Sequence, residues 1–289
     1  MPELPEVQTI VDDLRSAGIV GQKITGSIVL WLPLITGCSV PCFKKMIQGK
    51  YIRAISRRGK FIIISLSKGY FLLVHLRMSG HFSLVSADKI KEPHQHIVLV
   101  LGGKRELRYR DTRKFGRWHL TRDPSGILKK LGPEPLEKSF KPNRLYLLLQ
   151  SYRRQLKPFL LDQRLIAGLG NIYADEALWQ ACLHPRRLSS SLNKSESLAL
   201  FKAVRCVLRR AIRNKGTSLG SGIGNYKRLN EMSGRNQDRL MIVRNKGSVC
   251  PRCGTVITRV LVGQRATYTC AKCQKLCPSR RSEDQKKRS

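Results

Sequence analysis

Four cysteines near the C-terminal end constrain the fold of this chain more than any other feature. Cys250 and Cys253 form one C-x2-C knuckle, Cys270 and Cys273 form a second, and sixteen residues separate the two. Each knuckle can supply two thiolates to one tetrahedral ion, which is typical of a zinc ribbon. A redox dithiol is the alternative for a single knuckle, but it does not explain a second one at this spacing. The pattern predicts one structural Zn2+, because all four positions are filled by protein ligands.

The segment between the knuckles predicts a β-hairpin. From Val256 to Thr269 apolar and polar residues alternate, as in a strand with one covered face. Arg265 falls near the tip of this hairpin, where a guanidinium can bind phosphate through two parallel hydrogen bonds. From spacing alone, a solvated turn arginine is an equal alternative.

The charge of the chain indicates an anionic partner. Its 289 residues include 55 Lys plus Arg and 19 Asp plus Glu, which gives a net charge of +36. These basic residues are spread along the whole chain, which favours a nucleic-acid-binding body over binding to a ribosome or an anionic membrane. Met1–Glu6 does not resemble a signal peptide, and no apolar run is long enough to span a membrane. We therefore expect a cytoplasmic, nucleoid-associated protein without membrane contact. The sequence does not determine the oligomeric state, and a monomer is the working expectation.

Hydrophobic patterns divide the chain into a β-rich part and a helical part. The apolar positions between Val7 and Leu14 repeat at three and four residues, which predicts an amphipathic helix. Short β-rich runs follow between residues 22 and 120, at Phe61–Leu66, Tyr70–Leu76, His96–Leu101 and Arg105–Tyr109. With tight turns at Lys68-Gly69 and Gly102-Gly103, they indicate an antiparallel sandwich or barrel-like module. The prolines and glycine of residues 131–136 then mark a linker.

Beyond the linker the pattern predicts helices and one long loop. Asn193 and Glu196 have the spacing of a capping box, and apolar residues continue at helical spacing until Gly216. Residues 216–248 are rich in Gly, Asn and Ser and predict a long mobile loop, a kind of segment that is often functional. The polar and charged residues 278–289 predict a disordered basic tail.

Motifs along the whole chain resemble the formamidopyrimidine-DNA glycosylase family, which is related to endonuclease VIII. They begin with Met1-Pro2-Glu3-Leu4-Pro5-Glu6-Val7 and continue, in family order, with Arg58-Gly59-Lys60-Phe61, His75-Leu76-Arg77-Met78-Ser79-Gly80, Asp111-Thr112-Arg113-Lys114-Phe115-Gly116, the 131–136 linker, Leu161-Asp162-Gln163, Gly168-Leu169-Gly170-Asn171-Ile172-Tyr173-Ala174-Asp175-Glu176 and Gly263-Gln264-Arg265-Ala266-Thr267. The resemblance implies a multidomain α+β fold. Its parts would be an N-terminal antiparallel β-sandwich with flanking helices over 1–130, a helix-two-turn-helix domain with a lesion-capping loop over 137–240, and a zinc finger over 241–277.

The resemblance also implies a bifunctional DNA glycosylase and lyase of base excision repair. Once Met1 is removed, Pro2 carries a free α-amino group, whose ordinary pKa near about 8 leaves a useful neutral fraction at physiological pH. Attack on the sugar carbon that carries the damaged base forms a Schiff base, and elimination of the 3′ and then the 5′ phosphate nicks the strand. Glu3 is the natural general acid or base beside this amine. Glu6 either assists it or favours the helix N-terminus, and the resemblance marks Lys60 as an acid for β-elimination.

Family motifs further imply side chains that contact DNA. A flipped-out base leaves a gap that wedge side chains fill, and the resemblance implies that Met78, Arg113 and Phe115 do so. On their own, Met78 and Phe115 are more typical of a core. The other implied DNA contacts are His94, Arg153, Lys157 and Asn171, the last as a cap of the helix that follows Gly170.

Two departures from the family pattern bear on substrate choice. Ile242-Val243-Arg244-Asn245 stands where the family has Val-Tyr-Gly-Arg, which removes a local DNA contact, and the loop over Thr217–Arg239 has its own sequence. Motif order, Arg113 and Phe115 favour oxidised purines such as 8-oxoguanine and formamidopyrimidines. The alternatives are an endonuclease VIII-like enzyme for oxidised pyrimidines, an inactive protein that binds damaged DNA, and an RNA-binding zinc protein.

Overall fold

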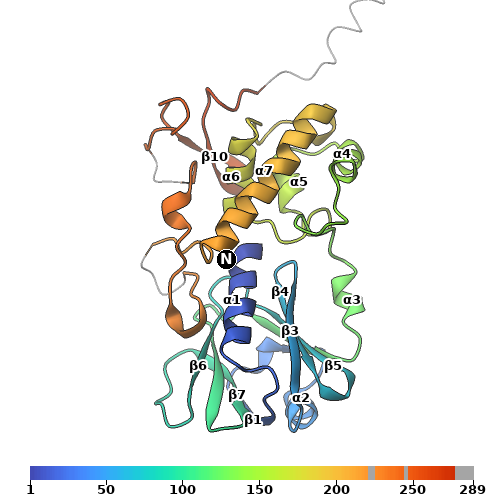
Figure 1. The fold of residues 1–289 in the computed structure, drawn as a ribbon, viewed down its shortest axis with the longest axis vertical. Helices are drawn as coiled ribbons and strands as arrows, with labels where there is room; N and C mark the ends of the chain where they lie inside the picture. Colours follow the sequence, from blue (N-terminus) through green and yellow to red (C-terminus); the bar gives the residue numbers. More distant parts are fainter. Residues whose placement is uncertain (221–224, 244–246, 277–289) are drawn as a thin grey trace, which may run out of the picture. The chain divides into compact units, whose positions relative to one another are not determined.

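In the computed structural model, residues 1–220, 225–243 and 247–276 are described. The described residues form two compact units, one from 1–130 with those of 211–238 and the other from 131–210 with those of 239–276 (Figure 1). The expected boundary at residue 240 therefore differs from this division, because residues 211–238 pack with the N-terminal part. Four features of the sequence lie outside the described residues. They are the 222–224 part of the loop, the pair Arg244 and Asn245, Cys277, and the 278–289 tail.

The N-terminal unit contains two sheets, as the sequence predicted. One has the order β2-β9-β5-β4-β3 and the other β1-β7-β8-β6. Their strands are β1 (Ile24–Val29), β2 (Ile35–Thr36), β3 (Ile52–Arg58), β4 (Phe61–Leu66), β5 (Tyr70–His75), β6 (His81–Ser86), β7 (Gln95–Leu101), β8 (Arg105–Arg110) and β9 (Arg117–Thr121). All pairings are antiparallel except the short parallel pair of β2 and β9. Buried side chains from both sheets form one core cluster.

Alternation along the chain explains these strands. In β4, buried and partly exposed residues alternate throughout, as expected for a strand with one face on the core. The turn between β4 and β5 places Lys68 and Gly69 at positive φ, and the turn between β7 and β8 does the same with Gly103 and Lys104. Both predicted hairpin turns are confirmed.

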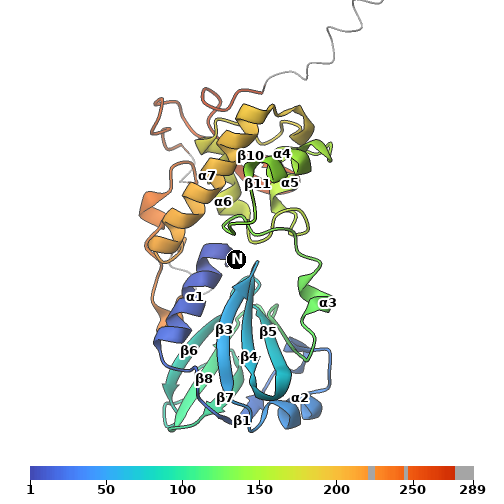
Figure 2. The ribbon, with the colours of Figure 1, turned by 45° about the vertical axis from the view of Figure 1, so that its right-hand side comes forward.

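Helix α1 (Leu4–Ser16) packs on this sandwich. Its apolar stripe, including Val7, Ile10 and Leu14, is fully buried, and burying a side chain of this size contributes roughly 1.5–3 kcal/mol. Arg15 Nε also donates to the carbonyl of Ile55 in β3 at 2.7 Å. Figures 1 and 2 show α1 alongside β3, with the chain's N-terminus at the same end of the unit as the β3–β4 turn. Two shorter helices, α2 (Val40–Ile47) and α3 (Ser125–Leu128), complete the elements before the linker.

The second unit is helical up to its C-terminal hairpin. Its helices are α4 (Pro142–Gln150), α5 (Leu156–Leu161), α6 (Asn171–Gln180) and α7 (Lys194–Arg213), the last of which extends into the segment 211–238. The predicted capping box is confirmed, because Glu196 N donates to Asn193 Oδ1 and Asn193 N donates to Glu196 Oε2, both at 2.9 Å. None of the helices in the described residues is long and apolar enough to cross a membrane.

The predicted hairpin between the cysteine knuckles is also confirmed. Strands β10 (Thr258–Val262) and β11 (Arg265–Thr269) pair antiparallel, with Val262 opposite Arg265. Gly263 and Gln264 make the turn, both at positive φ. Arg265 is therefore at the tip and exposed.

Candidate active site and nucleic-acid interface

The N-terminus of the chain lies against a carboxylate that joins two segments. Pro2 is buried, and Glu3 and Glu6 are each 2% exposed. Glu6 Oε2 accepts a hydrogen bond from Glu3 N, and its Oε1 accepts one from Thr217 N, both at 2.8 Å. Glu6 thus ties the residue beside Pro2 to the segment that follows α7, a role beyond the favourable charge of an acid in the first helical turn.

Close packing around Gly216 explains this arrangement. Gly216 has φ of +79°, and a Cβ there would lie 2.8 Å from the Tyr226 ring and 3.1 Å from Glu6 Cγ. Tyr226 itself is 7% exposed and belongs to the sandwich core. The described part of the predicted mobile loop is therefore anchored beside the N-terminus by Tyr226 and by Leu229, which is 4% exposed.

Lys60 lies in the tight turn between β3 and β4, next to Gly59 at positive φ. It is only 5% exposed. Its charge acts on His75 at the end of β5, where burial, then Arg77, then Lys60 lower the pKa of the imidazole to about 3. His75 Nδ1 accepts from Arg77 N at 3.0 Å, so the imidazole is held neutral in an electropositive surrounding.

Two loops that carry the expected wedge residues are joined through Asp111. Its Oδ1 accepts from the Ser79 hydroxyl, and its Oδ2 accepts from Gly116 N at 2.7 Å. Arg113 N donates to Ser79 Oγ at 3.1 Å. Asp111 is fully buried, so it fixes the loop of Met78 against the loop of Arg113.

Tyr109 determines how closely these loops approach. A Cβ at Gly80 would lie 2.2 Å from its hydroxyl oxygen, and one at Gly116 only 1.9 Å. Burial, then Asp111, raise the pKa of Tyr109, which keeps the phenol protonated.

Phe115 is 46% exposed, and the Arg113 guanidinium lies over its ring, 5.0 Å from the centroid. Phe115 is therefore outside the core, which was its alternative placement, whereas Met78 is half-buried.

His94 is exposed and adopts a positive φ of 66°. Its carbonyl accepts from Asp111 N at 3.0 Å, which connects it to the same loop. The buried neighbour His96 places Nε2 3.0 Å from the carbonyl of Asp111, and because a carbonyl only accepts, Nε2 carries the hydrogen. His96 is thus held in the structure, while His94 presents its ring to solvent.

In the second unit, Lys157 does not have the placement expected of a DNA contact. Its side chain is fully buried, and its Nζ lies 2.7 Å from Asp175 Oδ1 and 2.8 Å from both Ala266 O and Thr267 Oγ1. The carbonyl and the hydroxyl each accept one of the three ammonium hydrogens, and the Asp175 carboxylate balances the charge. We correct the expectation: Lys157 fastens the hairpin to helices α5 and α6.

Asn171 also differs from its expected place. Gly170 occupies the N-cap of α6, and Asn171 is the first helical residue. Its Nδ2 donates to the carbonyl of Ala266 at 3.0 Å, so the side chain does not cap the helix.

Arg153 and Arg265 are exposed, whereas Arg154 pairs with Asp162 at 2.9 Å. Of the two neighbouring arginines, Arg153 therefore keeps its charge at the surface.

The four cysteines form a site with the dimensions of a zinc centre. Their sulfurs all lie within 4.8 Å of one another, with Cys250–Cys273 at 3.8 Å and Cys253–Cys270 at 3.4 Å. Tetrahedral Zn–S bonds of about 2.3 Å require sulfurs about 3.8 Å apart. Trp179 Nε1 donates to Cys250 Sγ at 3.3 Å, which supports a thiolate there. The centre holds one structural zinc.

Glu176 has a structural role that was not predicted from the sequence. Its carboxylate is fully buried and accepts from the amides of Met241, Ile242 and Val243 at 2.8 to 3.0 Å. Arg210 lies 3.2 Å from it. Three successive amides around one carboxylate fix the segment that leads into the zinc finger, where the sequence departs from the family pattern. The only sequence signal is the acidic pair at the end of the Gly168–Glu176 motif.

Family models match three stretches of the chain. The formamidopyrimidine-DNA glycosylase N-terminal domain matches residues 1–118, the H2TH domain of the same family matches residues 131–223, and the zinc finger found in FPG and IleRS matches residues 247–276. These matches follow the sandwich, the helices and the cysteine hairpin in order.

Relatives and solved structures agree with these matches over nearly the whole chain. Formamidopyrimidine-DNA glycosylases of Protochlamydia amoebophila and Herpetosiphon aurantiacus are each 42% identical, over 95% of this chain and 100% of theirs. Crystal structures of the Lactococcus lactis enzyme, one a mutant with Fapy-dG-containing DNA and one with abasic-site DNA, match with TM-scores of 0.88 and 0.87 at 35% identity. Each covers 95% of this chain and 100% of its own.

Proposed function

The chain belongs to the formamidopyrimidine-DNA glycosylase family, and from this membership we propose that it removes oxidised purines from duplex DNA and nicks the strand at the same site. The observation that carries the proposal is the environment of Pro2. The residue is buried, lies two positions before α1, and is followed by the carboxylate of Glu3, whose amide donates to the bridging carboxylate of Glu6. While Met1 is attached, the Pro2 nitrogen is an amide, so removal of Met1 generates the nucleophile.

The Pro2 amine then acts on the sugar of the damaged nucleotide. Its nitrogen forms a bond to C1′ as the glycosidic bond breaks, and the proton that the amine loses goes to the departing base. Opening of the C1′–O4′ bond, with a proton from Glu3 to O4′, gives a cationic imine. Loss of a C2′ proton leaves its electron pair in this electron sink, and the resulting enamine expels the 3′ phosphate. A second elimination, with loss of the C4′ proton, expels the 5′ phosphate. Lys60, as the acid for the first elimination, would give its proton to the leaving phosphate.

The two loops joined by Asp111 supply the wedge from exposed Arg113 and Phe115 and half-buried Met78. Phe115 and Met78 provide apolar surface to fill the gap, and Arg113 can pair with the orphaned base. His94 and Arg153 are exposed cations or donors for phosphate. Asn171 and Arg265 meet at the hairpin, since the Asn171 amide binds the carbonyl of Ala266, the neighbour of Arg265. We assign Arg265 as the phosphate ligand there and Lys157 as the residue that holds the hairpin.

The substrates are oxidised purines in duplex DNA, and abasic sites. Solved structures of the related Lactococcus lactis enzyme are complexes with Fapy-dG-containing and abasic-site-containing DNA. Those ligands match the purine preference that the sequence favoured over the oxidised-pyrimidine alternative. The protein acts as a DNA repair enzyme with one structural zinc.

Borohydride trapping tests the mechanism directly. The protein is incubated with duplexes carrying one 8-oxoguanine, one oxidised pyrimidine or no lesion, and the linked residue is identified by mass spectrometry. We expect an adduct at Pro2 that is strongest on the oxidised purine, and a weaker adduct in Pro2→Gly. Glu3→Gln should slow base removal, whereas Glu137→Gln, an acidic residue of the linker region, is the matched control. Undiminished nicking by both Pro2→Gly and Glu3→Gln would refute the mechanism.

A further inference from the structure

A turn in the segment after α7 is attached to the edge of the sandwich. The turn is the 3-10 helix η4 (Leu229–Glu231), in which Asn230 and Glu231 have positive φ of 58° and 63°. Asn230 Oδ1 accepts from Leu84 N at 2.9 Å. Leu84 belongs to β6, the edge strand of its sheet, so Asn230 satisfies a backbone amide that has no neighbouring strand. Leu229 anchors the turn in the core.

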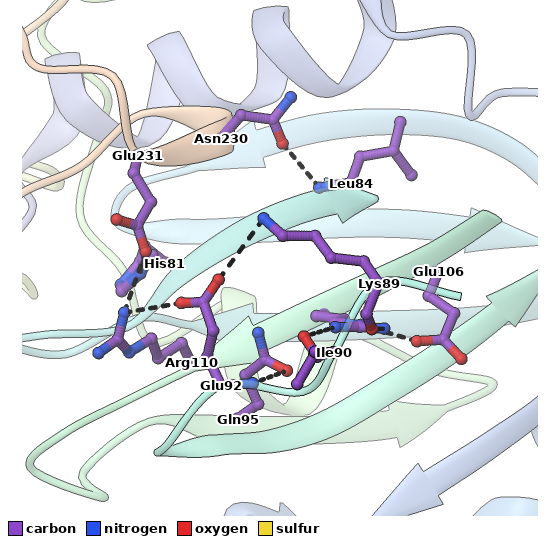
Figure 3. Close-up of polar contacts among 11 residues, drawn as sticks. His81, Leu84, Lys89, Ile90, Glu92, Gln95, Glu106, Arg110, Asn230 and Glu231 are labelled. Atoms are coloured by element: carbon purple, nitrogen blue, oxygen red, sulfur yellow. Dashed lines mark hydrogen bonds and ion pairs between the residues drawn. The ribbon is translucent and has the colours of Figure 1, made fainter. Parts of the chain in front are cut away.

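Glu231 makes the second attachment, to a pair of basic side chains on β6 and β8. Its Oε1 lies 3.0 Å from Arg110 Nη1 and 3.6 Å from His81 Nε2. His81 and Arg110 are direct partners in the β6–β8 register. Arg110 Nη1 also contacts Glu92, which lies outside the segment, at 3.2 Å. Figure 3 shows Glu231 and Glu92 converging on Arg110, with Lys89 next to Glu92.

The hydrogen on His81 is on the nitrogen that faces away from Glu231. His81 Nδ1 lies 3.1 Å from the carbonyl of Ser79, and because a carbonyl only accepts, Nδ1 is the protonated nitrogen of the neutral ring. Nε2 then turns a lone pair towards the Glu231 carboxylate, and it has no hydrogen-bond partner among the described residues. His81 is only 3% exposed. Arg110 is therefore the side chain that holds the Glu231 carboxylate on the sandwich.

From the turn, hydrogen bonds run back to the N-terminus. Gly234 N donates to Ser218 Oγ, and Asn236 Nδ2 donates to Thr217 Oγ1, both at 2.9 Å. Thr217 N in turn donates to Glu6, which accepts from Glu3 N. A second connection joins Arg228 to Asp13 of α1 at 2.7 Å. The position of the turn on the sandwich is thereby linked to the position of the first residues of the chain.

We propose that Asn230 and Glu231 are positioning residues for the reactive N-terminus. The inference rests on the proposed function for its kinetic consequence. Base removal requires the amine to meet C1′ of an intact nucleotide in one geometry, whereas an abasic sugar offers an open aldehyde that amines attack with little positional demand. A loosened turn therefore slows base removal more than nicking at a preformed abasic site.

Kinetics of Glu231→Ala, with Glu92→Ala as its matched control, test this inference. Both variants remove a carboxylate from Arg110, but only the first detaches the segment. We expect single-turnover excision of 8-oxoguanine to fall about 10-fold in Glu231→Ala while abasic-site nicking changes less than about 2-fold, with both rates preserved in Glu92→Ala. Equal loss of both activities in Glu231→Ala, or loss of neither, would overturn the proposal. Glu231→Gln, which keeps the side-chain shape, should give an intermediate loss.

Hydrogen exchange tests the attachment of the turn without relying on activity. Amide exchange of residues 225–238 is measured at one pH in the unmodified protein, in Glu231→Ala and in Glu92→Ala. We expect less protection of these amides in Glu231→Ala and unchanged protection in Glu92→Ala. Equal protection in all three proteins would refute the attachment through Glu231. Absence of any Schiff base on abasic DNA would instead refute the proposed function, and the exchange result would still show whether the turn is attached.

Discussion

Lys157 and Asp175 form an ion pair of 2.7 Å in which both side chains are fully buried. The same ammonium binds two residues of β11, and Asp175 Oδ2 accepts from Tyr268 N at 3.0 Å. One pair of opposite charges therefore fastens the zinc hairpin, and Arg265 with it, to the helices. A lysine in this position contributes to DNA binding through the placement of its neighbours.

Salt dependence of DNA binding should separate Arg265 from Lys157. A residue that neutralises one phosphate contributes about 0.9 to the slope of log affinity against log salt. We expect Arg265→Ala to reduce that slope by about one unit and Lys157→Met to leave it unchanged while lowering affinity. A reduced slope in Lys157→Met would show that Lys157 is a phosphate ligand.

Stability should distinguish the buried ion pair of Lys157 from the partly exposed ion pair of Arg154. Breaking a buried ion pair costs about 3–5 kcal/mol, whereas Arg154→Ala should cost less than about 1 kcal/mol.

Gly116→Ala should disturb the loop that carries Arg113 and Phe115. The new Cβ would lie 1.9 Å from the Tyr109 hydroxyl, and such overpacking costs about 1–3 kcal/mol. Chemical denaturation measures the loss, and fluorescence of 2-aminopurine opposite the lesion measures insertion of the wedge, which should weaken in parallel.

Tyr109→Phe in the Gly116→Ala background provides the check, because it removes the clashing oxygen and should recover part of both losses. Gly126→Ala is the control, since a Cβ there meets nothing within 4 Å. An equal loss in the two alanine variants would contradict the packing argument.

Acid should destabilise the N-terminal unit through His75. Its folded-state pKa is lowered to about 3, first by burial, whereas an unfolded histidine titrates near about 6.5. Between these values the unfolded chain binds a proton that the folded one does not, so stability falls with decreasing pH by up to about 1.4 kcal/mol per unit. Urea denaturation between pH 6 and pH 4 should show a smaller loss in His75→Gln. Identical pH dependence in both proteins would show that His75 is not the group responsible.

Removal of zinc should impair DNA binding before it affects the sandwich. The metal is the only cross-link that the sequence indicates between the two knuckles, and a structural zinc site folds with its metal. We expect a chelator to abolish lesion binding while amide protection in β4, β5 and β7 persists. Binding that survives complete zinc loss would show that the finger is not needed for DNA contact.

Local patterns predicted most of the fold. Alternation gave β4, and helical spacing with the Asn193–Glu196 box gave α7, because each depends on neighbours within a few residues. The cysteine spacing predicted the hairpin and the metal for the same reason. The wedge and the N-terminal acids came from the family resemblance, and the structure adds how Asp111 and Glu6 hold them.

Other features depended on partners far along the chain. Lys157 resembles any surface lysine until Asp175 and residues 266–267 enclose it. Asn171 was expected to cap α6, yet its amide binds the hairpin carbonyl of Ala266 instead. Described residues between Gly216 and Asp238 gave no periodic signal, because Tyr226 and Leu229 supply their buried apolar contacts to the core.

The use of both early and late residues in the N-terminal unit has a consequence for biosynthesis. Glu6 obtains its contact from Thr217, and the turn at Glu231 is made later still, so a ribosome must finish the helical region before the surroundings of Pro2 are complete. At about 5–20 residues per second this delay is on the order of ten seconds. A nascent chain that has already folded its sandwich therefore still lacks the contacts that order Pro2 for base removal, and it acquires them only near the end of translation.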